Sequence, residues 1–168
     1  MLKKSFILSY LLYGFIAAFL YCVPLFYFIK KASFTNTWVL YLGNFMFLFS
    51  IVVFVLSFYK KNGKNGSTMN IVAAGHITTI VGVFLTCIVA LLLLMHYVPD
   101  LFENGISPKL LLKSPAQTSD GKTNGLIFIT FMNATIGNIA AGSFVSVILP
   151  YSARRNQTKD KSPKGLEK

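Results

Sequence analysis

Four long apolar blocks, separated by polar segments, set the pattern of this chain. None of the blocks contains an Asp, Glu, Lys or Arg, and they cover residues 6–29, 37–59, 71–95 and 126–150. An α-helix needs about 20 residues to cross the hydrocarbon core of a bilayer. Strands of a membrane barrel would be about 10 residues long and would alternate polar with apolar positions. The pattern therefore predicts an all-α integral membrane protein, a bundle of four transmembrane helices.

Composition strengthens this prediction. Charged residues make up 12% of the chain, against roughly 25% in an ordinary soluble domain. A soluble domain of 168 residues has too little interior to bury so much apolar surface. The first block follows a basic start at Lys3 and Lys4, and it exceeds the roughly 7–15 apolar residues of a cleaved signal peptide. We therefore expect the first block to be retained as a signal anchor.

The distribution of Lys and Arg predicts the orientation. With both termini inside, the inner segments hold 11 of the 16 basic residues and the outer segments hold the other 5. Cytoplasmic segments carry the excess of basic residues in most membrane proteins. The N-terminus and the C-terminus are therefore expected in the cytoplasm, with the chain in a plasma (inner) membrane. Lys30 and Lys31 form the one pair that this orientation places outside.

The segments between the blocks differ in length and composition. The first link is short and the second, residues 60–70, is rich in Asn and Gly, so the spans are expected to form two antiparallel hairpins. Ser67 or Asn70 is expected to cap the third helix. The chain then divides into a membrane domain, residues 1–151, with one long outer loop at 96–125, and a basic cytoplasmic tail, 152–168, which is predicted to be disordered.

Small and polar residues inside the third and fourth spans form two stripes at helical spacing. Helix association in lipid relies on close approach and on polar contacts between helices. If the two spans are antiparallel, residues whose numbers sum to 221 lie at the same depth, which pairs Thr79 with Gly142 and brings Gly82 near Asn138. The candidate site is therefore an intramembrane polar seam: His76, Thr79, Gly82, Thr86, Asn133, Gly137, Asn138, Gly142 and Ser146.

This seam has two interpretations. The first is adhesion between helices through small residues, and the second is a polar path for a small solute with His76 near its inner mouth. Possible hydrogen-bond partners of His76 at similar depth are Tyr10, Tyr13 and Ser146. A titratable group within a span is uncommon, so a proton-linked role for His76 is the sharper alternative to a structural one.

The residues needed for most membrane chemistry are missing. The two histidines are 20 residues apart, about 30 Å along one helix, so they cannot share a metal or a haem. No carboxylate lies within a span for acid–base catalysis. Small four-helix exporters of cationic drugs share only the helix count with this chain, because they rely on a glutamate within their first span. We expect no catalytic residues, no cofactor and no metal.

These observations predict a noncatalytic accessory or scaffold subunit of a membrane assembly. The alternative is a small oligomeric permease or channel for a small neutral or proton-coupled solute. The formal net charge of +11 is expected to contact anionic lipid headgroups rather than nucleic acid, because most of it flanks the spans. The expected partners are thus the bilayer and a membrane protein or a second copy of the chain.

Overall fold

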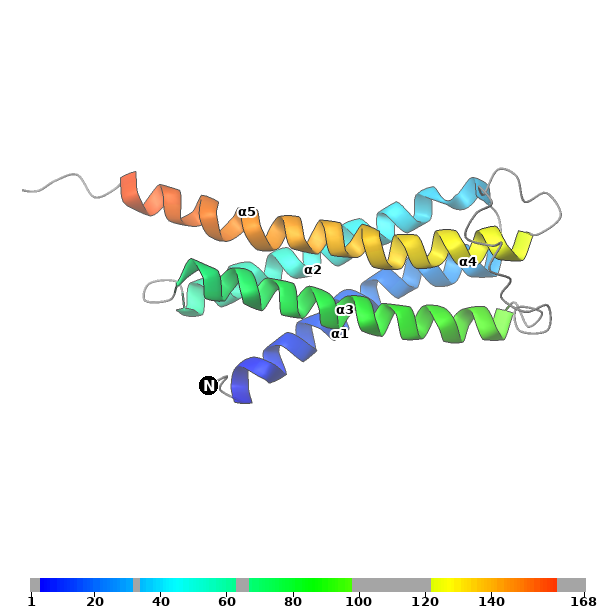
Figure 1. The fold of residues 1–168 in the computed structure, drawn as a ribbon, viewed down its shortest axis with the longest axis horizontal. Helices are drawn as coiled ribbons and strands as arrows, with labels where there is room; N and C mark the ends of the chain where they lie inside the picture. The colour runs from blue at the N-terminus through cyan, green and yellow to red at the C-terminus, as the bar shows by residue number, and fades with distance from the viewer. Residues whose placement is uncertain (1–3, 32–33, 63–66, 98–121, 160–168) are drawn as a thin grey trace, which may run out of the picture.

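The structure consists of long helices. A computed structural model describes residues 4–31, 34–62, 67–97 and 122–159, and every element in these ranges is helical. In chain order these elements are α1 (Lys4–Lys31), the short 3-10 helix η1 (Phe34–Asn36), α2 (Trp38–Asn62), α3 (Thr68–Tyr97), α4 (Lys122–Met132), the π-helical η5 (Asn133–Gly137) and α5 (Asn138–Lys159). The last three follow one another without a break and form one rod (Figure 1). The predicted all-α bundle of four membrane-spanning helices is confirmed.

Each rod is long and apolar enough to cross a membrane. The candidate spans are Phe6–Lys31, Trp38–Lys61, Thr68–Tyr97 and Gly125–Ala153. Polar residues fix their ends. Ser67 precedes α3, and its Oγ accepts a hydrogen bond from the backbone N–H of Met69 at 3.3 Å, so the predicted cap is present. Lys60 and Lys61 lie in the last turn of α2, where the helix dipole favours positive charge.

The four rods form a ring in which α1 and the α4–η5–α5 rod occupy opposite corners. Each of these two contacts both α2 and α3. The N-terminal end of α1 and the C-terminal end of α5 lie at the same end of the bundle, as an even number of crossings requires (Figure 1). We call it the N-terminal end of the bundle and the other the far end.

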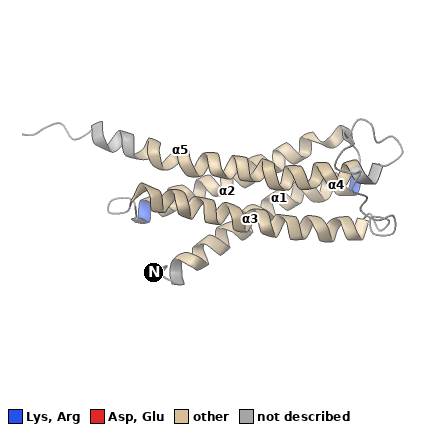
Figure 2. Cartoon of the chain, in the orientation of Figure 1, with Lys and Arg blue, Asp and Glu red and all other residues tan. Residues whose placement is uncertain are grey.

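Large apolar side chains face outward on every rod. Leu8 on α1 is 68% exposed, Phe45 on α2 65%, Phe84 on α3 65% and Phe144 on α5 63%. Exposed apolar surface on this scale is unfavourable in water but suits contact with lipid chains. Charged residues coloured in Figure 2 lie only at helix ends within the described ranges. The distribution is that of a multi-pass membrane protein.

The last helix is longer than the sequence indicated. We predicted a disordered tail from residue 152, but α5 continues to Lys159. Ala153, Arg154, Arg155 and Gln157 have good helix propensity, so the backbone hydrogen bonds continue past the apolar block. Residues 160–168 of the predicted tail and 98–121 of the predicted outer loop lie outside the described residues.

Candidate functional site

The stripe of small and polar residues on the fourth rod faces the interior along its whole length. Its members recur every four residues and are all buried: Thr130, Ala134, Asn138, Gly142 and Ser146. A spacing of four exceeds the 3.6 residues of an α-helical turn, so the stripe would rotate by about 40° at each step. The π-helical η5 lies in the middle of the stripe. Its wider turn offsets part of this rotation and keeps both halves directed inward.

The crossing of α3 and α5 is closed by two glycines. A Cβ atom built on Gly142 would collide with the side chain of Thr79, and one built on Gly75 would collide with Ser146. Both pairs obey the antiparallel register expected from the sequence, because their residue numbers sum to 221. The two backbones therefore approach closely at this level, which only glycine permits.

The hydroxyl groups of this seam are satisfied within their own helices. Thr79 Oγ1 donates to the carbonyl of Gly75 at 2.9 Å, Thr86 Oγ1 to Gly82 at 2.9 Å, and Ser146 Oγ to Gly142 at 2.6 Å. Each bond returns to the carbonyl four residues earlier, a local pattern common for Ser and Thr in helices. These side chains thus need neither water nor a solute to complete their hydrogen bonding.

Gly82 departs from the expected seam. A Cβ on this residue would lie 2.8 Å from Phe47 Cε2 on α2 and 3.2 Å from the carbonyl oxygen of Gly14 on α1. A Cβ on Gly14 would in turn lie 2.7 Å from Val81 Cγ1. We expected Gly82 near Asn138, but the atoms nearest to it belong to α1 and α2, at the crossing of α1 and α3.

Polar residues of α1 and α2 complete the interior. Tyr21 is fully buried, and its hydroxyl donates to Asn133 Oδ1 at 3.3 Å, across the bundle. Gly43 makes room for this ring, since a Cβ there would lie 3.0 Å from Tyr21 Cδ2. A Cβ on Gly137 would lie 2.8 Å from Asn44 Nδ2, so the amide of Asn44 lies against η5. Tyr21 and its glycine were not among the predicted residues.

Four buried polar atoms of the described residues have no hydrogen-bond partner. They are Asn44 Oδ1, Thr130 Oγ1 and Asn138 Oδ1, and the hydroxyl of Tyr59. Asn138 is fully buried, and its Nδ2 donates to the carbonyl of Ala134 at 3.0 Å, so only its oxygen is unpaired. A buried unpaired acceptor costs stability, and π-helical segments such as η5 often occur at functional sites. The unpaired oxygen of Asn138 thus lies directly after the π-helical segment.

His76, the one histidine of the predicted seam, is bonded to its own helix. His76 is half-buried, and its Nδ1 donates to the carbonyl of Val72 on its own helix at 2.9 Å. Of the partners considered for it, Ser146 bonds to Gly142 and Tyr10 packs on Phe54 with ring centroids 5.8 Å apart. Among the described residues, no group of three His, Cys, Asp or Glu side chains is arranged to hold a metal ion.

No protein family, curated protein or solved structure matches this chain.

Proposed function

We propose that this chain is a noncatalytic accessory or scaffold subunit of a membrane assembly. One contrast carries the proposal. The interior is closed by glycine contacts and by hydroxyls bonded to their own helices, whereas the outer surface of α2 presents an aromatic stripe. Trp38, Tyr41, Phe45 and Phe49 are between 59% and 65% exposed and recur at helical spacing.

This aromatic stripe supports a helix of a partner membrane protein as its occupant. Its residues lie at i, i+3, i+7 and i+11, which is one continuous face of α2. Rigid aromatic side chains provide large contact areas at low entropic cost and are enriched in protein interfaces. An aromatic face that served lipid contact alone would gain nothing from this regular alignment, since lipid chains solvate any apolar residue.

Site-specific photo-crosslinking in native membranes tests this role. A photoreactive amino acid at Phe45 is expected to link the chain to a protein of one defined mass. The matched control is Phe84 on α3, which has the same 65% exposure and should link to lipid only. Labelling of lipid alone from both positions, together with a monodisperse monomer after mild solubilisation, would contradict the proposal.

The proposed orientation places the N-terminal end of the bundle on the cytoplasmic side of a plasma membrane. The observation in its support is the excess of basic residues in the segments at that end, which hold 11 of the 16 in the chain, among them Lys60 and Lys61 in the last turn of α2. Reporter fusions that are active on only one side of the membrane test it. Both termini should give the cytoplasmic signal, and an external signal from either end would reverse the assignment.

A second candidate function, a small permease for a neutral or proton-coupled solute, is favoured by one observation. Asn138 is fully buried and keeps an unpaired oxygen next to the π-helical segment. Replacing it by Leu, a side chain of similar size, removes the unpaired oxygen and should leave stability unchanged or raise it. Solute uptake into proteoliposomes that is lost in Asn138→Leu, without loss of the folded protein, would establish the permease in place of the accessory role.

A further inference from the structure

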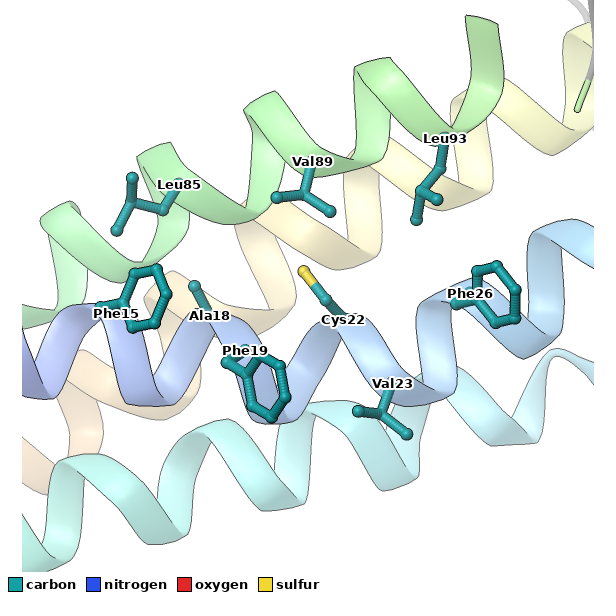
Figure 3. Close-up of a pocket in the computed structure, with 9 residues that line it drawn as sticks. All are labelled: Phe15, Ala18, Phe19, Cys22, Val23, Phe26, Leu85, Val89 and Leu93. Atoms are coloured by element: carbon teal, nitrogen blue, oxygen red, sulfur yellow. The ribbon is translucent and has the colours of Figure 1, made fainter. Parts of the chain in front are cut away.

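An apolar groove runs along the outside of the bundle between α1 and α3. Its cavity volume is about 420 Å³, within the range of roughly 300–1,000 Å³ typical of ligand sites. Along α1 it extends from Phe15 to Phe26, and along α3 from Leu85 to Leu93 (Figure 3). Its floor includes Ala18 and the free thiol side chain of Cys22. No lining residue is charged.

The groove begins where α1 and α3 separate. The helices run parallel and are in closest contact at Gly14 and Gly82. Immediately beyond this crossing, toward the far end of the bundle, both helices carry the bulky side chains that line the groove. Phe15 and Leu85 begin the groove there, one and three residues after the two glycines. The groove is therefore a fixed consequence of the glycine crossing.

The dimensions of the groove match one leaflet of a bilayer. The eleven helical steps from Phe15 to Phe26 rise about 16 Å, and half of a hydrocarbon core is about 15 Å. An extended acyl chain of one leaflet would therefore run along the whole length of the groove.

The far end of the groove carries positive charge. The Phe26 ring packs edge-to-face on Tyr97, with centroids 5.6 Å apart, and Lys30 Nζ lies 6.0 Å from the centroid of the same ring. Lys30 and Lys31 end α1 and are both exposed. An aromatic pair beside a lysine ammonium at a helix end is the arrangement expected at the boundary between hydrocarbon and headgroups. A phosphate at this level would face the lysines while its chain followed the groove.

We propose that this groove is a binding site for one anionic phospholipid. One acyl chain lies between α1 and α3, and the phosphate contacts Lys30 and Lys31. The site also explains why two lysines end α1 on the side that the distribution of basic residues makes external. It is independent of the aromatic stripe on α2, which lies on a different helix.

Native mass spectrometry of the purified full-length chain tests the site with two lipids that share the same acyl chains. Phosphatidylglycerol is expected to remain bound at one copy per chain and to bind more tightly than phosphatidylcholine. Lysines near an anionic lipid contribute roughly fivefold each in affinity. Replacing Lys30 and Lys31 by Gln should therefore remove most of the preference, whereas the same change at Lys60 and Lys61, at the opposite end, should leave it intact.

A second variant fills the groove. Val89→Trp places an indole in the acyl-chain path and should abolish retention of both lipids. The neighbouring Ile88→Trp is the matched control, since Ile88 is 42% exposed and does not line the groove. Thermal unfolding of both variants checks that the bundle remains folded, and the lysine variants test the site even if Val89→Trp does not fold.

Three results would overturn the proposal. Equal retention of the two lipids by the native chain would exclude recognition of the phosphate. Unchanged retention in a folded Val89→Trp variant would exclude the groove as the path of the chain. A change in the dimer fraction of Val89→Trp, with retention of lipid unchanged, would assign the groove to a second copy of the protein instead.

Discussion

Two sides of the bundle are joined in opposite ways at the same end. Between α1 and α2, near the N-terminal end, aromatic rings interlock: Phe6 contacts Phe58 at 5.6 Å between centroids, and Phe54 contacts Tyr13 at 5.3 Å. Between α3 and α5, at the same end, the contacts are Gly75 with Ser146 and Thr79 with Gly142. Large side chains fill the interface of α1 with α2, whereas glycine, serine and threonine form the interface of α3 with α5.

The contrast shows two solutions to one physical problem. Lipid chains are as apolar as Leu or Phe, so burial of apolar surface gives little reason for helices to associate. The aromatic side gains dispersion energy from many contacts between large, stiff rings. The glycine side gains dispersion energy by bringing the two backbones together, so an added side-chain atom has no room there. The two sides should therefore respond in opposite ways to substitutions that add or remove volume.

The largest loss of stability is expected from a substitution on the glycine side, between α3 and α5. Gly142→Leu inserts four carbons where a single Cβ already collides with Thr79, and the obstacle includes the Cβ of Thr79, which is fixed to the backbone. We expect the free energy of unfolding in detergent to fall by about 3 kcal/mol, at the upper end of the cost of overpacking. Denaturant titration followed by circular dichroism measures it.

Ala140→Leu is the matched control for this variant. Ala140 lies on the same helix and is exposed, so added carbons there meet lipid or detergent and should change stability by less than about 0.5 kcal/mol. Equal stability of Gly142→Leu and the native chain would show that α3 and α5 do not approach as closely as the two glycines indicate.

A smaller loss of stability is expected from a substitution on the aromatic side, between α1 and α2. Phe54 is 1% exposed and contacts the rings of Tyr10, Tyr13 and Phe58. Phe54→Ala should cost about 2 kcal/mol, less than the roughly 3–5 kcal/mol measured in soluble cores, because a detergent micelle removes much of the transfer term. The same titration measures it, with the 65% exposed Phe45→Ala as control. A loss larger than that of Gly142→Leu would reverse the ranking of the two sides.

The sequence was sufficient to predict the spans and the pairing within each hairpin. Uncharged blocks long enough to cross a bilayer permit few alternatives. Alignment of the block ends at Ile71 and Pro150 was enough to pair Thr79 with Gly142. The crossing of α1 with α3 was not predictable in this way. Gly14 stands alone in an aromatic helix, and neighbours in a bundle that do not share a hairpin leave no spacing rule in the sequence.

The π-helical segment η5 was not predicted, although the sequence contains a signal for it. The stripe from Thr130 to Ser146 recurs at a strict spacing of four, and a regular α-helix cannot keep such a stripe on one face over four steps. This mismatch was present in the sequence and indicates a departure from regular α-helical geometry between Thr130 and Ser146. The groove between α1 and α3, in contrast, depends on how two helices separate after their crossing, which requires the structure.

The smallest loss of stability is expected from removal of the hydrogen bond that links α1 to the α4–η5–α5 rod. Tyr21→Phe removes the hydroxyl that donates to Asn133 at 3.3 Å while keeping the ring against Gly43. Polar contacts between membrane helices average about 0.6 kcal/mol, and we expect a loss of this size. A double-mutant cycle with Asn133→Ala isolates the contact, since either change alone should remove the same interaction. Additive losses in the double variant would mean that the bond contributes nothing, and that Tyr21 is held in the interior by the shape of its ring alone.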